Sequence, residues 1–376
     1  MSQSGLNMSR RIRRTPFTGK VEQCGVRGFS VVNHMLLPKA FASSVEEDYW
    51  HLREHVQVWD VSVQRQVQIT GPDAARLVQL MTPRDLRGAK LGKCLYVPLI
   101  DENAGMLNDP VLIKLAEDKF WLSIADSDVL LWAKGLAIGF GLKVQIDEPD
   151  VSPLAVQGPK AEALMTEVFG DGIRDLGYFD YAFFDLFGTR QLIAKSGYSK
   201  QGGFEIYLEG GHLGPDLWDL IWEAGQAHNI TPGCPNLIER IEGGLMSYGN
   251  EFTRANNPIE CGFEGLCYFG DEIDYIGKAA LAQIAASGVT MMLRGVKFGD
   301  NKAPPCGAPF PITMKKDAVK DNTMIGAITS GIYSPRLKAN VGMSMIAKPH
   351  WQTGTEVFVH TPDGSIHDGV IADFPF

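Results

Sequence analysis

The sequence predicts an α+β fold, with two related α+β lobes followed by a C-terminal β-barrel-like domain. Three observations support this prediction: an internal repeat, a hairpin after each copy of it, and a change to short strands and turns from about residue 289. With 376 residues, the chain is long enough for two or three domains with a sizeable core.

The internal repeat consists of a short strand, a Gly-Pro turn and a helix. Its first copy is VQITGPDAARLVQLM at residues 67–81, and its second is LAVQGPKAEALMTEVF at residues 154–169. In both copies a proline stands near the first turn of the helix, where its missing N–H would have no helical partner anyway. A duplication of this kind usually forms a concave surface between its halves, so we expect a ligand site there.

Each copy is followed by a segment with the pattern of a β-hairpin. Residues 111–125, VLIKLAEDKFWLSIA, predict two strands joined by a charged turn at Glu117 and Asp118. Residues starting at 183, FFDLFGTRQLIAKSGY, predict a second hairpin that turns at Gly188 and Thr189. The two lobes therefore share the order strand, helix, hairpin.

Helical stretches and then short strands complete the chain. Helices are expected in LWDLIWEAGQAH, NLIERIEGGLMSYG and KAALAQIAAS. Beyond them, RGVKFGD, MIGAITSG and GTEVFVHTPDGSIHDGVIA predict strands, with a hairpin turn at 362–364, and together they predict the barrel-like domain. The expected parts are an N-terminal segment packing on the body (1–44), a first lobe (45–150), a second lobe with helices (151–288) and the barrel-like domain (289–376).

Composition and charge argue against several classes of function. The formal net charge of −9 disfavours a nucleic-acid backbone as the main partner. No apolar run approaches the roughly 20 residues of a membrane-spanning helix. The basic residues 10–14, RRIRR, precede no apolar stretch, so we interpret them as a solvated tail rather than a signal peptide. The six cysteines form no C-x-x-C pair, which favours reduced thiols in a cytoplasmic protein.

One short motif has the spacing of a metal site. His51, Glu54 and His55 fit H-x-x-E-H, with the histidines four residues apart on a predicted helix. No other cluster supplies an obvious third ligand, and the helix is polar over most of its surface, so we expect an exposed helix and no metal. The G-x-x-x-x-G-K-[ST], G-x-G-x-x-G and G-x-S-x-G loops do not occur, which weakens nucleotide binding, a Rossmann cofactor and serine hydrolysis.

Two carboxylates are the best candidates for chemistry. Glu205 lies in GGFEIYLE, where the alternation predicts a half-buried strand with Phe204, Ile206 and Leu208 inward. By default Glu205 then faces solvent, and Asp109, which precedes a proline, ends a turn. Each carboxylate lies in the hairpin of its own lobe, so both can point into one cleft if the lobes face each other.

A carboxylate can accept two parallel hydrogen bonds from a fork of N–H donors. The fork can be an arginine of the protein or the 2-amino-pyrimidinone edge of a pterin. Aromatic neighbours could sandwich such a ring, namely Tyr96, Tyr178, Phe179 and Tyr207. Composition does not choose between the two forks.

The motifs around Glu205 resemble those of a known family. GYSKQGGFEIYLE is similar to the GYTGEDGFEIY stretch of folate-dependent aminomethyltransferases, the T-proteins of glycine cleavage. The similarity extends, in order, to WDVSVQRQVQITGPDA, LIDENAGMLNDPVLI, RIEGGLMSYGNEFTRANNPIECG, YIGKAAL and ITSGIYSPRLKANVGM, and it covers about residues 12–372. The chain is thus identified as a member of this family, which implies a T-protein-like fold with folate bound by the second lobe.

The sequence departs from the T-protein pattern in an informative way. Asn108-Asp109 stands where T-proteins have Asp-Asp, Asn236 falls near the arginine of their GARDSLRLE segment, and their N-terminal G-W-x-M-P-V-Q-Y stretch is absent. RTPFTGKVEQCGVRGFSVVNHMLLP, LNDPVLIKL and SGYSKQGGFEIYLE instead resemble the dimethylsulfoniopropionate demethylase branch, which moves a methyl group from a sulfonium to tetrahydrofolate.

The resemblance implies a set of site residues. Glu205 would bind the pterin edge of tetrahydrofolate, and Asp109 would be the catalytic residue near its N5 atom. The remaining cofactor-binding candidates are Tyr96, Phe179, Tyr207 and Ser123, and the substrate-binding candidates are Tyr198, His34, Tyr178 and Arg336. Arg336 is chosen, with Lys338, only because its charge suits a substrate carboxylate; a charge pair on the barrel surface is the alternative.

The implied reaction is a direct displacement in which N5 attacks the methyl group on S⁺, giving methylmercaptopropionate and 5-methyltetrahydrofolate. Alignment of the three atoms and exclusion of water would supply most of the rate. We expect small-molecule partners only, no metal, and a monomer or homodimer. The alternatives are a glycine-cleavage T-protein with a lipoyl carrier partner and a non-enzymatic folate-binding accessory protein, whose K-G-C-Y-x-G-Q-E motif does not occur here.

Overall fold

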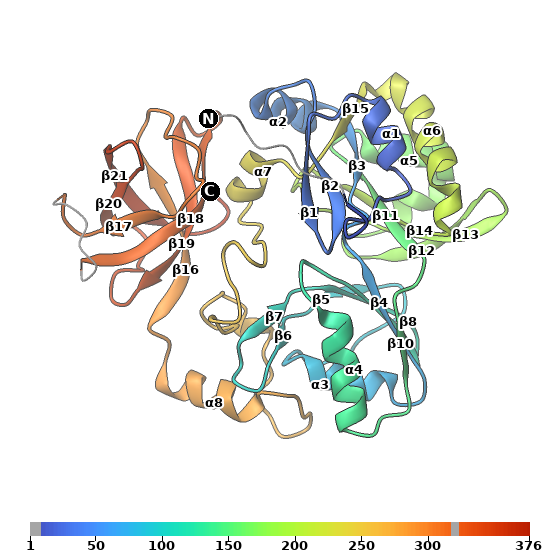
Figure 1. Ribbon diagram of the computed structural model, residues 1–376, viewed down its shortest axis with the longest axis horizontal. Coiled ribbons are helices and arrows are strands. Elements are labelled where there is room, and N and C mark those ends of the chain that lie inside the picture. Colours follow the sequence, from blue (N-terminus) through green and yellow to red (C-terminus); the bar gives the residue numbers. More distant parts are fainter. Residues whose placement is uncertain (1–8, 317–322) are drawn as a thin grey trace. The chain divides into compact units, whose positions relative to one another are not determined.

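The structure is a computed structural model that describes residues 9–316 and 323–376 (Figure 1). The chain forms two compact units, and each is made of several segments. Of the described residues, unit 1 comprises 9–78, Arg87–Tyr96 and Pro110–Asn236, and unit 2 comprises Gln79–Leu86, Val97–Asp109, 237–316 and 323–376.

The larger sheet of unit 1 has six strands in the order β12-β13-β14-β11-β3-β15. Neighbouring strands are antiparallel, except that β15 runs parallel to β3. Their bounds are β3 Val56–Asp60, β11 Val151–Gln157, β12 Tyr181–Leu186, β13 Thr189–Ala194, β14 Gly203–Glu209 and β15 Ile230–Gly233.

Helices cover one face of this sheet. Phe204, Ile206 and Leu208 of β14 point to that face and pack in one core cluster with Leu164 and Trp218. The covering helices are α1 (Thr18–Gln23), α5 (Ala161–Phe169) and α6 (Gly214–Gly225), which lie beside the six-stranded sheet (Figure 1). Short 3₁₀ helices, η1 (Asp171–Asp175), η2 (Gly211–Leu213) and η3 (Gln226–His228), adjoin α5 and α6.

A second sheet of unit 1 has five strands in the order β10-β4-β9-β8-β5. Trp121 and Ile113 of this sheet share a buried cluster with Leu192, Ala194 and Tyr207 of the six-stranded sheet. The strands are β4 Gln66–Thr70, β5 Cys94–Tyr96, β8 Val111–Ala116, β9 Lys119–Ser123 and β10 Gln145–Asp147, accompanied by α3 (Ala74–Met81) and α4 (Val129–Gly139).

Residues 204–209 belong to a strand, β14, as predicted, but the expectation that this strand is half-buried is wrong. β14 is buried from Gly203 to Leu208 and exposed only at Glu209. Its apolar side meets the helices, and its other side, with Tyr207, meets the five-stranded sheet. The default solvent-facing position of Glu205 is therefore also wrong, because a second sheet covers the face that alternation assigned to water.

The predicted repeat and hairpins are confirmed. The two copies form β4–α3 and β11–α5, and β8 and β9 turn at Glu117 and Asp118. The second hairpin, β12–β13, turns at Phe187 and Gly188, one residue earlier than predicted. Both turn residues have positive φ, 49° and 77°, as two-residue hairpin loops of type I′ require.

The N-terminal part of unit 1 carries a hairpin and a capped helix. β1 (Gly28–Val32) and β2 (Met35–Ala40) are followed by α2 (Val45–Glu54), which Ser44 and Glu47 start with a capping box. The histidines of the H-x-x-E-H motif have partners there: His51 Nε2 lies 2.9 Å from the Asn229 carbonyl oxygen, and His55 Nδ1 lies 2.9 Å from Lys160 Nζ.

Unit 2 contains a closed barrel in the order β16-β19-β18-β17-β20-β21, which confirms the predicted C-terminal β-barrel-like domain. The expected turn at 362–364 joins β20 to β21. The barrel strands are β16 Met291–Phe298, β17 Phe310–Thr313, β18 Met324–Ser334, β19 Ala339–Ala347, β20 Glu356–His360 and β21 Ile366–Ala372. Outside the barrel lie β6 (Leu99–Ile100), β7 (Met106–Asn108), α7 (Leu237–Glu242), η4 (Glu264–Leu266) and α8 (Lys278–Ser287).

Helix α7 is much shorter than the helical stretch predicted over 236–249. It ends at Glu242, directly before Gly243 and Gly244. Gly244 has a φ of +66°, a left-handed conformation that ends a right-handed helix.

The predicted bounds of the four parts stay a prediction. Residues 56–60, inside the range expected for the first lobe, form β3 and pair with β11 and β15 of the other sheet. The strands of one sheet thus come from distant parts of the chain.

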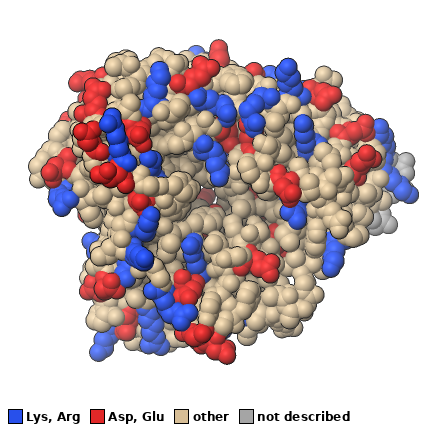
Figure 2. All heavy atoms as spheres, turned by 180° about the vertical axis from the view of Figure 1, so that it is seen from behind, with Lys and Arg blue, Asp and Glu red and all other residues tan. Residues whose placement is uncertain are grey.

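The surface and the thiols complete the description. The face in Figure 2 carries Lys and Arg side chains interspersed with Asp and Glu side chains. All six cysteines are free thiols. Among the helices that the structure describes, none has both the length and the apolar character needed to cross a membrane.

We expect the buried carboxyl of Asp60 to make unit 1 less stable as the pH rises. Burial raises its pKa to about 6, against the opposing hydrogen bonds from Thr15 and Ser62. Because the pKa of Asp60 is higher in the folded state, its protonated carboxyl stabilises the fold. This stabilisation is complete below the pKa of the unfolded chain, near 4, and is lost as the pH rises through about 6. The free energy of unfolding should fall by about 1.4 kcal/mol from this group between about pH 5 and pH 7.5.

The measurement is urea denaturation at both pH values for the wild type and Asp60→Asn. Asparagine cannot ionise, so the difference between the two proteins isolates Asp60 from all other titrating groups. Equal pH dependence in both proteins would contradict the assignment.

Candidate functional site

The glycine-rich loop between β13 and β14 folds around one buried side chain, Gln157. Gln157 Nε2 donates to the Ser196 carbonyl oxygen at 3.0 Å, and Gln157 Oε1 accepts from Ser199 Oγ at 2.7 Å. A Cβ at Gly197 would lie 2.1 Å from this amide and one at Gly203 2.6 Å from it. The glycines therefore permit close packing of the loop on Gln157.

This loop leads into β14 and the carboxylate of Glu205. Glu205 is only 5% exposed, and its Oε2 accepts a hydrogen bond from Ser196 Oγ at 2.5 Å. Burial raises the pKa of Glu205, while the Ser196 hydroxyl acts in the opposite direction. Because a carboxylate offers about four acceptor positions, Glu205 retains capacity for further N–H donors.

Polar groups from both sheets of unit 1 gather next to Glu205. Tyr207, two residues along β14, is fully buried and stacks on Trp121 with ring centroids 6.4 Å apart. Burial raises the pKa of Tyr207 well above its usual range, the charge of Glu205 raises it further, and the Ser123 hydroxyl opposes the change. Ser123 Oγ in turn accepts from Gln66 Nε2 at 3.0 Å. The cluster thus contains an acid, a phenol, a hydroxyl and an amide.

Two aromatic residues stand beside this cluster. Tyr178 and Phe179 have ring centroids 4.7 Å apart. Backbone hydrogen bonds hold Phe179 to Lys195 (2.9 Å) and to Cys94 (2.8 Å), although its φ of +63° is strained. Tyr178 is largely exposed, and its pKa is raised first by partial burial and then by the charge of Glu205. The charge of Glu205 therefore acts on Tyr178, which was predicted as a substrate contact.

Three other predicted residues of unit 1 lie at different positions. Tyr96 is half-buried at the end of β5 and pairs with Val111, and Tyr198 is half-buried in the glycine-rich loop. His34 is exposed at the tip of the β1–β2 hairpin, with a φ of +61°. Within the described residues, His34 makes no hydrogen bond or ring contact with the Glu205 cluster.

Asp109 belongs to unit 2, where it follows β7. It is half-buried, and its N–H donates to the Asn108 side-chain oxygen at 3.0 Å. The pKa of Tyr248 is raised, mainly by burial, and the charge of Asp109 contributes to this shift. Burial also raises the pKa of Cys261, with further contributions from Glu260 and Asp109. Asp109 thus acts electrostatically on at least two partly or fully buried neighbours.

Arg336 has an ion-pair partner in unit 2. Its Nε donates to Glu242 Oε2 at 2.9 Å, and its Nη2 donates to the Phe376 carbonyl oxygen at 3.1 Å. Glu242 is nearly fully buried and also accepts from Ser334. The guanidinium is therefore already neutralised inside unit 2, in line with the alternative of a charge pair at the barrel.

Sequence reasoning missed three residues of the Glu205 cluster. Ser196 contacts the carboxylate, Gln157 shapes the loop, and Gln66 holds Ser123. Of these three residues, only Ser196 stands next to a motif that the sequence analysis singled out, the glycine-rich loop. Gln66 and Gln157 lie on strands far away in the chain, so no short motif could point to them.

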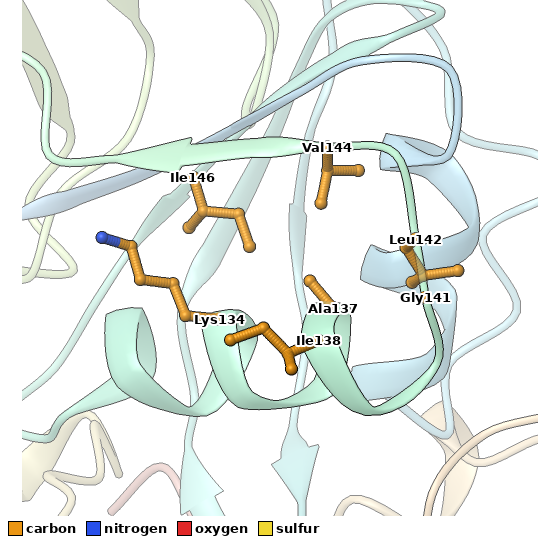
Figure 3. Close-up of a pocket in the computed structure, with 7 residues that line it drawn as sticks. All are labelled: Lys134, Ala137, Ile138, Gly141, Leu142, Val144 and Ile146. Carbon is orange, nitrogen blue, oxygen red and sulfur yellow. The ribbon is translucent and has the colours of Figure 1, made fainter.

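A surface depression of about 370 Å³ lies elsewhere in unit 1. It is lined by α4 and the segment leading into β10, and its walls are apolar apart from Lys134 (Figure 3). The lining residues are Lys134, Ala137, Ile138, Gly141, Leu142, Val144 and Ile146. None is a predicted site residue. Over the described part of the chain, no group of three His, Cys, Asp or Glu side chains has the arrangement of a metal site.

Comparison with known proteins gives consistent relationships. Residues 18–270 match the GCVT N-terminal domain, and residues 307–376 match the glycine cleavage T-protein C-terminal barrel domain. The chain is 50% identical over 356 residues to the dimethylsulfoniopropionate demethylase DmdA of Ruegeria pomeroyi, a match that covers 95% of each protein. It is 29% identical over 368 residues to an aminomethyltransferase of Halalkalibacterium halodurans, covering 96% of this chain and 97% of that protein.

Among solved structures, the glycine cleavage system aminomethyltransferase T from Bartonella henselae is similar with a TM-score of 0.84. The sequence identity is 23%, and the match covers 97% of this chain and 98% of that one. This likeness concerns the fold and confirms the predicted T-protein-like arrangement.

Proposed function

Since this chain belongs to the glycine cleavage T-protein family, we propose that it is a methyltransferase that moves a methyl group from dimethylsulfoniopropionate to N5 of tetrahydrofolate. The products are methylmercaptopropionate and 5-methyltetrahydrofolate. The observation that carries this proposal is the 50% identity, over 95% of both chains, to a curated dimethylsulfoniopropionate demethylase. Identity to the aminomethyltransferase named above is only 29%.

The Glu205 cluster has the chemistry to hold a reduced pterin. The pterin presents adjacent N–H donors on one edge, and a carboxylate accepts such a pair through two parallel hydrogen bonds. Glu205 is buried, accepts a hydrogen bond from Ser196 on one of its oxygens, and is flanked by Tyr207. Phe179 and Tyr178 supply aromatic surface next to it. We assign Tyr96 and Ser123 to the same cofactor.

The reaction breaks the C–S bond and forms a C–N bond. The N5 lone pair attacks the methyl carbon, the C–S electron pair returns to sulfur as a neutral thioether, and positive charge appears on nitrogen. We assign Asp109 to stabilise that charge and to accept the N5 proton. Aromatic rings attract a sulfonium through cation–π interaction, about 2 kcal/mol when water is excluded. Tyr178, Tyr198 and His34 stay proposed substrate contacts.

The decisive experiment mixes the purified protein with tetrahydrofolate and dimethylsulfoniopropionate under anaerobic conditions. We expect formation of 5-methyltetrahydrofolate and methylmercaptopropionate in equal amounts, measured by mass spectrometry. Absence of both products, together with tetrahydrofolate-dependent ammonia release from aminomethyl-lipoyl carrier protein, would replace this proposal with the aminomethyltransferase alternative.

We expect Glu205→Gln to weaken tetrahydrofolate binding by about tenfold to a hundredfold, because hydrogen bonds to a charged group contribute about 1.5–3 kcal/mol. Calorimetry measures this loss. Glu209→Gln is the matched control, since Glu209 is the exposed carboxylate of the same strand. Unchanged affinity in Glu205→Gln would remove Glu205 from the cofactor site.

The same group predicts a pH dependence of binding. Burial raises the pKa of Glu205 in the ligand-free protein, whereas the N–H donors of the pterin favour its ionised form. Binding therefore releases a proton, so the affinity should fall as the pH drops through the pKa of Glu205. Glu205→Gln should lose this dependence, while Glu209→Gln should retain it.

A further inference from the structure

Two buried polar atoms of the Glu205 cluster lack hydrogen-bond partners within the described residues: Tyr207 Oη and Gln66 Oε1. The side chains are 0% and 1% exposed. Leaving a buried polar group unpaired is costly, and folded proteins seldom do so without a reason. The two atoms mark a place where a ligand would complete the hydrogen bonding.

The orientation of the Gln66 amide is fixed by its other partners. Gln66 Nε2 donates to the Gln64 carbonyl oxygen at 2.7 Å and to Ser123 Oγ at 3.0 Å. A carbonyl oxygen can only accept, so reversing the amide would set two acceptors against each other. Ser123 therefore accepts from Gln66 and keeps its own proton for a further partner.

The Tyr207 hydroxyl lies beside Ser123 and has no partner among the described residues. Trp121 and Ser123 lie on the same side of β9 because they are two residues apart, and the Trp121 ring stacks on Tyr207. The Ser123 hydroxyl opposes the rise in the pKa of Tyr207, as a donor to the phenol oxygen does. If the free Ser123 proton turns to the phenol oxygen, the O–H proton of Tyr207 is left for a ligand.

On β14, Tyr207 and Glu205 occupy the same face of the strand, two residues apart. The site thus presents a carboxylate that accepts hydrogen bonds next to a phenol that donates one. The complementary ligand edge carries two N–H donors followed by a carbonyl oxygen. A 2-amino-4-oxo pterin has this order along one edge: the 2-amino group, N3–H and the C4 carbonyl.

We propose that Gln66, Ser123 and Tyr207 form a relay that selects the 4-oxo group of the pterin, with Gln66 as a positioning residue. This inference rests on the proposed function and specifies how its cofactor is recognised. A 4-amino pterin places N–H donors where Tyr207 requires an acceptor, so two donors would face each other. A site built around a specific hydrogen bond discriminates strongly against an analogue that cannot form it.

The test compares the binding of tetrahydrofolate with that of its 4-amino analogue, tetrahydroaminopterin, by calorimetry. The wild type should favour the 4-oxo compound by about tenfold or more, which corresponds to one hydrogen bond between neutral groups. Tyr207→Phe should reduce this preference to about threefold or less, and Gln66→Leu should reduce it partly because Ser123 and Tyr207 are no longer oriented. The ligand-free Tyr207→Phe protein should melt at an equal or higher temperature, because it no longer buries an unpaired hydroxyl.

Tyr181→Phe is the matched control. Tyr181 belongs to the same buried cluster, but its hydroxyl donates to the Lys114 carbonyl oxygen. This variant should keep the wild-type preference between the two pterins.

The outcomes separate the relay from the proposed function. A wild type that demethylates dimethylsulfoniopropionate but binds both pterins equally would overturn the relay alone. Equal loss of affinity for both pterins in Tyr207→Phe, with a lower melting temperature, would also overturn it and leave a structural role. A wild type that binds neither pterin and shows no turnover would overturn both the relay and the proposed function.

Discussion

Replacing Asp109 with alanine is expected to lower the rate of methyl transfer by about a hundredfold or more while the protein still folds. The loss corresponds to about 2.7 kcal/mol in the activation barrier. The physical reason is that positive charge develops on N5 during the displacement. A fixed carboxylate next to that atom stabilises the charge without any reorganisation of solvent.

The surroundings of Asp109 suit such a role. The side chain is half-buried, and its charge contributes to the raised pKa values of Tyr248 and Cys261. A carboxylate that perturbs neighbouring groups in this way is poorly screened by water, so it should act strongly on a nearby cation as well. Its backbone N–H is held by the Asn108 side chain, which fixes the start of the segment.

Single-turnover kinetics of 5-methyltetrahydrofolate formation measures the effect, and circular dichroism verifies the fold. Glu102→Ala is the matched control, because Glu102 is an exposed carboxylate in the turn before β7. It should retain the wild-type rate. Turnover by Asp109→Ala within about threefold of the wild type would remove Asp109 from the mechanism.

Replacing Arg240 with methionine should lower the free energy of unfolding of unit 2 by about 3–5 kcal/mol. Arg240 Nη1 pairs with Glu251 Oε2 at 2.8 Å, and the two side chains are only 8% and 0% exposed. Glu251 also accepts from the Ser247 N–H at 2.7 Å and from the Ser330 hydroxyl on β18. The pair therefore joins α7 and its following loop to the barrel, and removing the cation leaves a buried charge without its partner.

Chemical denaturation followed by tryptophan fluorescence measures this loss. Glu251→Gln added to Arg240→Met should recover part of it, because the uncompensated charge is then gone. Lys316→Met is the control for an exposed pair: Lys316 and Asp368 are 61% and 77% exposed, so its loss should stay below about 1 kcal/mol. An equal effect of Lys316→Met and Arg240→Met would show that burial of the pair is irrelevant.

Much of the local structure could be predicted from the sequence because it depends on neighbours in the chain. The β8–β9 turn at Glu117 and Asp118, the two Gly-Pro turns before α3 and α5, and the turn between β20 and β21 are examples. Helix α7 was predicted too long, because Gly244 adopts a left-handed conformation that a hydrophobic pattern does not register.

The candidate site was predictable only in part. Glu205 was singled out from its glycine-rich loop and strand, and the family resemblance then gave it a role, but the alternation of the strand assigned it to solvent. Arg336 was chosen for its charge, and the structure pairs that charge with the buried Glu242. In both cases the surroundings of the side chain are made by residues far away in the sequence: the second sheet for Glu205, and Glu242 for Arg336.

By itself the sequence determined the family, the strand–helix–hairpin repeat and the barrel, since these follow from short-range periodicity, turn residues and contiguous motifs. Only the tertiary structure decided that Glu205 and Tyr207 are buried, and that Ser123 and Gln66 join them. The physical reason is that alternation specifies which residues share a face of a strand, whereas the burial of that face depends on the second sheet that packs against it.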